Sequence, residues 1–96
     1  MNKALIHLFN DLQLQTKDYS AKKKFQLLAE YLDHLVSHDF NKLLNILYRV
    51  DVSEEKAKHA LATKKDKETN GEILAKLLLE RESEKIKWRA YYKNRS

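Results

Sequence analysis

The chain contains no cysteine, no proline and a single glycine, Gly71. Without cysteine it can form neither a disulfide nor a thiolate nucleophile, and this composition suits a reducing cytoplasm. An all-β fold needs turn residues, chiefly Gly, Pro and Asn, at roughly every 8–12 positions, whereas a helical fold needs only polar caps at the ends of its helices. The scarcity of turn residues therefore predicts an all-α fold.

Long hydrophobic runs are also absent. No stretch approaches the ~18 consecutive apolar residues of a membrane-spanning helix, and the apolar start of the chain is interrupted by His7, Asn10 and Asp11. We therefore expect no signal peptide and no membrane span, and a cytoplasmic location. A single glycine also cannot supply a glycine-rich phosphate-binding loop.

The net charge of +5 is confined to one end of the chain. Residues 1–84 contain 14 basic and 14 acidic side chains, whereas residues 85–96 contain five bases and no acid. Any attraction to a polyanion is therefore expected to act locally, at the C-terminal end, because the rest of the chain is neutral on balance.

Apolar residues recur at helical spacing and predict a small bundle of four or five antiparallel helices in one domain, residues 1–96. Four helices are expected within residues 1–63, a polar connection over 64–70, and a long C-terminal helix over 71–93. Asp39 can cap the third helix, although the second and third helices could also form one bent helix, because nothing between them forbids helix. The expected caps are Asp18 or Ser20, Asp39, Ser53, and a capping box of Thr69 with Glu72.

Each predicted helix has an apolar face. We expect the third helix to bury Phe40, Leu43, Leu44, Leu47 and Val50, and the weakly apolar fourth helix to bury two alanines and a leucine. The remaining expected core residues are Leu5, Leu8, Phe9 and Leu12 of the first helix, Phe25, Leu28, Leu32, Leu35 and Val36 of the second, and Ala57, Ala60 and Leu61 of the fourth.

The long last helix is uneven along its length. Its first half is rich in leucine, but residues 80–85 contain no large apolar side chain. Glu80, Glu82 and Glu84 predict a solvated face, with Glu82 close to Lys85 and Glu84 close to Lys87. We therefore expect the first half to dock on the bundle and the second half to project beyond it.

The stretch "NKLLNILYRVDVSEEKAKHAL", from Asn41 to Leu61, together with the leucine-rich helix near Leu77, resembles small uncharacterised helical proteins of bacteria. The resemblance covers about half of the chain. It implies a helical fold and brings no activity and no site residues.

The same stretch has the outline of a helix-turn-helix DNA-binding unit. A recognition helix meets base edges with its N-terminal residues, but here those residues are Glu54 and Glu55. Two carboxylates oppose the phosphate attraction on which DNA binding depends. The pattern therefore favours two ordinary helices joined by a turn that Ser53 caps.

Catalytic, cofactor and metal sites are not expected. His34 and His38 lie four residues apart, a spacing that can hold a metal ion, but no third ligand is evident near His7 or His59. The serines fall at predicted caps, on helix surfaces or at the terminus. We therefore predict a protein that is not an enzyme.

The final stretch "EKIKWRAYYKNRS" is the strongest functional signal. Bases alternate with aromatic residues, a composition found on single-stranded nucleic-acid surfaces, at protein interfaces and at membrane surfaces. Cations also complement the dipole at a helix C-terminus. The candidate contact residues are Lys85, Lys87, Trp88, Arg89, Tyr91, Tyr92, Lys93 and Arg95.

Helical phase places Trp88 and Tyr92 on one face, with Tyr91 beside them and basic residues on the flanks. A lone helix that exposed three aromatic rings would leave an apolar patch in water. We therefore expect a non-catalytic scaffold or protein–protein interaction module that self-associates through its C-terminal helix. The partner is expected to be a second copy or another protein, and nucleic-acid binding is the alternative.

Overall fold

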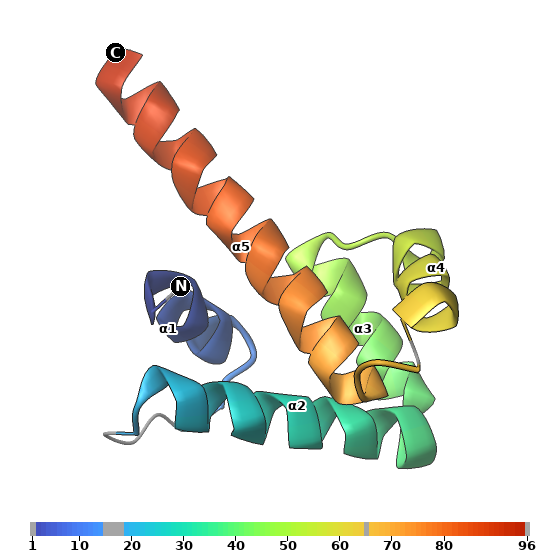
Figure 1. Cartoon of the computed structure of the whole chain (residues 1–96). Coiled ribbons are helices and arrows are strands. Elements are labelled where there is room, and N and C mark those ends of the chain that lie inside the picture. Colours follow the sequence, from blue (N-terminus) through green and yellow to red (C-terminus); the bar gives the residue numbers. More distant parts are fainter. Residues whose placement is uncertain (1, 15–18, 65, 96) are drawn as a thin grey trace.

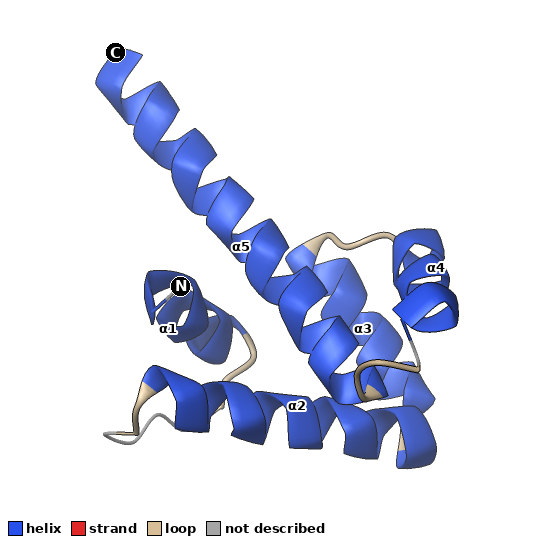
Figure 2. Ribbon diagram, in the orientation of Figure 1, coloured by secondary structure: helices blue, strands red, loops and turns tan. Residues whose placement is uncertain are grey.

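The computed structural model describes residues 2–14, 19–64 and 66–95, and these form five α-helices and no strand (Figures 1 and 2). The helices are α1 (Asn2–Asp11), α2 (Ala21–His38), α3 (Phe40–Val50), α4 (Glu54–Lys64) and α5 (Asn70–Arg95). The prediction of an all-α fold with a long C-terminal helix is confirmed.

Polar side chains begin the helices where the sequence predicted. The side chains of Ser20, Asp39 and Ser53 each accept a hydrogen bond from the backbone amide three residues later, at 3.1, 3.2 and 3.0 Å. Thr69 and Glu72 form a reciprocal capping box, each side chain accepting from the other's backbone amide at 3.1 Å. These contacts pair amides that have no partner within the helix. Asp18, the other predicted cap of α2, lies outside the described residues.

Asp39 also settles whether α2 and α3 are continuous. Its backbone is non-helical (φ −151°, ψ 71°), and its amide donates to the carbonyl of Leu35 at 2.9 Å. The same residue therefore ends α2 and caps α3, so the two are separate helices.

The only glycine lies where α5 crosses α2. A methyl group at Gly71 would overlap the backbone carbonyl of Ala29, so the two helices approach more closely here than any other residue type permits. The Gly71 amide, in the unpaired first turn of α5, donates to a carboxylate oxygen of Asp33 at 2.7 Å. This contact fixes where α5 starts on the bundle.

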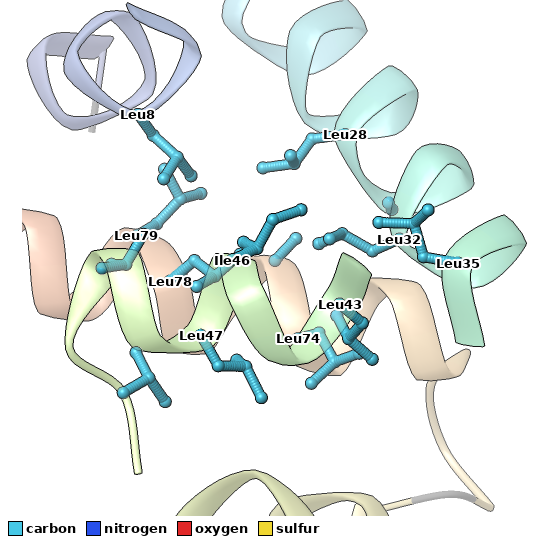
Figure 3. Close-up of a cluster of buried hydrophobic side chains, with 14 of the residues drawn as sticks. Leu8, Leu28, Leu32, Leu35, Leu43, Ile46, Leu47, Leu74, Leu78 and Leu79 are labelled. Atoms are coloured by element: carbon cyan, nitrogen blue, oxygen red, sulfur yellow. The ribbon is translucent and has the colours of Figure 1, made fainter. Parts of the chain in front are cut away.

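The hydrophobic core surrounds the first half of α5 (Figure 3). Side chains from α1, α2, α3 and α5 converge there, which buries the leucine faces that periodicity predicted. The labelled core residues are Leu8 of α1, Leu28, Leu32 and Leu35 of α2, Leu43, Ile46 and Leu47 of α3, and Leu74, Leu78 and Leu79 of α5. The α4 helix covers one side of α5 through the smaller Ala57 and Ala60.

Two core predictions for α3 need correction. Phe40 is exposed, whereas the sequence placed it in the buried stripe, and Ile46, which the predicted stripe omitted, is buried. Phe40 is the first residue of α3, directly after the break at Asp39, and therefore lies at the edge of the core. The buried face is centred on Leu43, Ile46, Leu47 and Val50, at spacings of three and four residues.

The second half of α5 extends away from the other helices (Figure 1). Ile86 is the last apolar residue of α5 that packs against the core, and residues 87–93 are all exposed. Within the described part of the chain, no helix has the length and apolar character required to cross a membrane.

Candidate interaction surface at the end of α5

Three aromatic side chains form a cluster on the projecting part of α5. Trp88, Tyr91 and Tyr92 are 54%, 47% and 65% exposed. The Trp88 ring stacks on Tyr92 with centroids 5.8 Å apart, and Tyr91 meets both rings edge-on at 5.7 and 5.6 Å. These distances fall within the range of favourable aromatic pairs. The cluster is therefore formed before any partner arrives.

The predicted basic residues are placed unequally around this cluster. Lys87 and Arg89 are exposed, and so is Lys93. Lys85 is only 20% exposed, and its ammonium group lies 3.9 Å from Glu82. The side chain of Arg95 lies outside the described part of the chain. The exposed basic side chains therefore begin at Lys87, directly before Trp88, and border the aromatic cluster.

Glu82 is the largest departure from the sequence-based prediction. It was expected on a solvated face but is only 1% exposed, and neither carboxylate oxygen accepts a hydrogen bond from a described residue. Burial raises the pKa of Glu82, and the neighbouring carboxyl of Asp11 raises this pKa further. Lys85 and Arg89 act in the opposite direction. The predicted pairing of Glu82 with Lys85 is confirmed, but within the protein interior.

Burial of Glu82 follows from the packing of α1. Glu82 lies four residues after Leu78, so it continues the buried stripe of α5. At that level α1 covers α5 and brings Asp11 alongside. Only the position of α1 decides this, which is why the run of three glutamates gave no signal of it.

Arg81 connects α5 to the end of α3. Its guanidinium nitrogens lie 3.0 Å from Asp51 and 3.0 Å from Glu84. Asp51 has a left-handed backbone (φ 68°) that ends α3. Glu84 was predicted to pair with Lys87, but it pairs with Arg81, which leaves Lys87 without an ion pair to a described residue.

Several hollows border α5, and two of them lie beside its exposed face. The larger, about 670 Å³, is an apolar groove between the start of α2 and the middle of α5. It is lined by Ala21, Lys22, Phe25, Lys76, Leu79, Glu80 and Ser83. The second, about 500 Å³, lies beside the aromatic cluster and is lined by Glu84, Lys87, Trp88 and Tyr91. Sequence reasoning missed the groove, because the side chains that line it come from two helices whose crossing no local pattern specifies.

The structure adds little support for the metal-site and helix-turn-helix candidates. The rings of His34 and His38 lie on one face of α2, 4.7 Å apart. No group of three or more potential metal ligands occurs among the residues that the structure describes. In the helix-turn-helix candidate, Glu54 pairs with Lys58 at 3.3 Å and stays at the start of α4.

Comparison of the chain with family models, with curated proteins and with solved structures finds no match. The resemblance to small helical bacterial proteins stays a prediction. The interpretation of the surface therefore depends on its geometry.

Proposed function

We propose that this protein is a non-catalytic helical interaction module that self-associates through the C-terminal half of α5. The bundle supplies a rigid base, and α5 presents an aromatic and basic surface beyond it. The observation that supports this most directly is the exposed three-ring cluster of Trp88, Tyr91 and Tyr92. Rings of this size supply most of the binding energy at many protein interfaces.

A further feature supports a binding role rather than a catalytic one, and another bears on location. Two carboxylates that precede the aromatic cluster are engaged in packing or an ion pair: Glu82 is buried and Glu84 pairs with Arg81. The absence of cysteine supports a place in the reducing cytoplasm.

The sole tryptophan allows self-association to be measured directly. On dilution from about 100 μM to 0.1 μM, a dimer should dissociate and expose Trp88, shifting its fluorescence emission to longer wavelength. Light scattering at the upper concentration should give twice the chain mass. A monomer at tens of micromolar, with emission independent of concentration, would contradict self-association.

The aromatic cluster can be tested against a matched control. The substitutions Tyr91→Ala and Tyr92→Ala together should weaken the dimer at least tenfold. Tyr48→Ala removes an aromatic side chain from α3 that is 65% exposed, the same fraction as Tyr92. If the control weakened the dimer as much as the double variant, the cluster would not be the interface.

Nucleic-acid binding is the second candidate, because exposed Lys87 and Arg89 border rings on which bases could stack. The rings already stack on one another, which favours packing over base stacking. Binding of a single-stranded oligonucleotide should quench Trp88 and weaken steeply with salt. The double variant Lys87→Glu/Arg89→Glu should abolish it, while Lys22→Glu/Lys23→Glu, the same change of charge on α2, should not.

A further inference from the structure

The two hollows lie toward opposite ends of one side of α5. Lys76, Glu80, Ser83, Lys87 and Ala90 follow one another at spacings of three and four residues, so they share one face of the helix, here called the outer face. The apolar groove borders this face at Lys76, Glu80 and Ser83, and the aromatic hollow borders it at Lys87. The outer face therefore extends from the apolar groove to the hollow beside the aromatic cluster.

The acidic and basic residues of the outer face would pair if two copies of α5 lay antiparallel. Glu80 and Lys87 are seven residues apart, and neither forms an ion pair with another described residue. They are equally distant from a point between Ser83 and Glu84. A second α5 laid antiparallel across this point would bring Glu80 of each copy opposite Lys87 of the other. A parallel arrangement would instead oppose like charges, which is unfavourable.

The same antiparallel register matches the hollows. Reflection about the point between residues 83 and 84 places Ala90 of one copy at the level of Leu77 of the other. It places Tyr91, at the edge of the outer face, at the level of Lys76. Phe25 lines the groove and is only partly buried, so a second α5 on the outer face would cover apolar surface that water otherwise reaches. At the crossing point lies Ser83, whose small side chain permits close approach of two helices. A two-fold axis creates both contacts at once, which doubles the buried area.

We infer that a second copy of this chain occupies the apolar groove between α2 and α5, with the two α5 helices antiparallel and crossing at Ser83. This inference rests on the proposed self-association and adds its orientation, its register and its counter-surface. The α5 helix of the other copy covers the groove, and Glu80 pairs with Lys87 across the axis.

The absence of native cysteine makes the register testable by cross-linking the full chain. Ser83→Cys lies at the axis, so two copies of this residue should come within the roughly 4.4–6.8 Å Cα separation of a disulfide. Ala90→Cys is the matched control on the same face. In the antiparallel register its two copies are separated by 13 helical residues, or about 20 Å. Oxidation should therefore link Ser83→Cys and leave Ala90→Cys unlinked.

The cross-linking results distinguish failure of the antiparallel register from failure of self-association itself. Cross-linking of both variants would indicate parallel helices and overturn the inference while self-association stands. A dimer by light scattering in which neither variant cross-links would place the interface elsewhere and also overturn the inference. A monomer would contradict both proposals.

Charge-reversal variants test the pairing of Glu80 with Lys87 independently of cross-linking. Glu80→Lys and Lys87→Glu should each weaken the dimer by about three- to tenfold, because each opposes like charges across the axis. The double variant should recover most of the loss, since the pair is then reversed but intact. If the double variant were weaker than both single variants, Glu80 and Lys87 would not be partners.

Discussion

Glu82 lies in the core although its carboxyl group, when ionised, is more stable in water. Transfer of an ionised carboxylate out of water is costly unless donors surround it. Here the nearest cation is Lys85 at 3.9 Å, and the carboxyl of Asp11 adds repulsion. The group therefore holds its proton more tightly in the folded than in the unfolded chain, as its raised pKa records.

A pH dependence of stability follows from Glu82. Because its folded pKa lies above the ordinary value of 4.5, the protonated form stabilises the fold fully below pH 4.5. That contribution is lost as the pH rises through the raised value. Glu82→Gln should therefore raise the free energy of unfolding by about 1–2 kcal/mol at pH 7, with little gain at pH 4, as urea denaturation can measure.

The control for this prediction is Glu30→Gln, which removes an exposed carboxylate from α2. It should change stability by less than ~0.5 kcal/mol at either pH, as surface substitutions usually do. Equal effects of Glu82→Gln at pH 4 and pH 7 would show that ionisation of Glu82 does not limit stability.

At the scale of the elements, the packing of α5 on α2 depends on Gly71. Gly71→Ala would raise helix propensity, which on an exposed surface stabilises by about 1 kcal/mol. The added methyl group meets the Ala29 carbonyl, which is backbone and cannot turn aside. We expect the clash to dominate and unfolding free energy to fall by about 1–3 kcal/mol, as measured by urea denaturation.

Asn70→Ala serves as the comparison, because Asn70 is the exposed neighbour of Gly71 in the first turn of α5. It should change stability by less than ~0.5 kcal/mol. A stabilised Gly71→Ala variant would mean that α2 and α5 are not in close contact at this crossing.

At the scale of the whole molecule, the core contacts and the candidate interaction surface occupy different parts of α5. The last core contact of α5 is Ile86, and the aromatic cluster begins at Trp88. A chain ending at Lys87 should therefore keep its helical circular-dichroism spectrum, apart from the eight α5 residues removed from Trp88 to Arg95. It should be monomeric by light scattering at 100 μM.

The thermal midpoint of the truncated chain tests whether the two parts are independent. At low concentration, where the full chain is also monomeric, the two midpoints should agree within a few degrees. At high concentration the full chain should unfold at a higher temperature, because association stabilises the folded state. A truncated chain that lost its fold would show that the projection supports the bundle.

Much of this molecule could be predicted from the residues alone. Helix positions followed from leucine periodicity and from caps such as Ser53, because these signals operate within one or two turns. The aromatic cluster also followed from phase, since Trp88 and Tyr92 are four residues apart on one helix.

What the tertiary structure decided is which surface each helix face meets. The burial of Glu82, the partner of Glu84 and the apolar groove all depend on side chains from different helices or on competition between neighbours. Helical periodicity defines a face but not the element that covers it. Local sequence therefore determined where this protein is helical and where its charge lies. Only the packing of α1 and α2 against α5 decided which carboxylate was removed from water and which apolar groove stayed open to solvent.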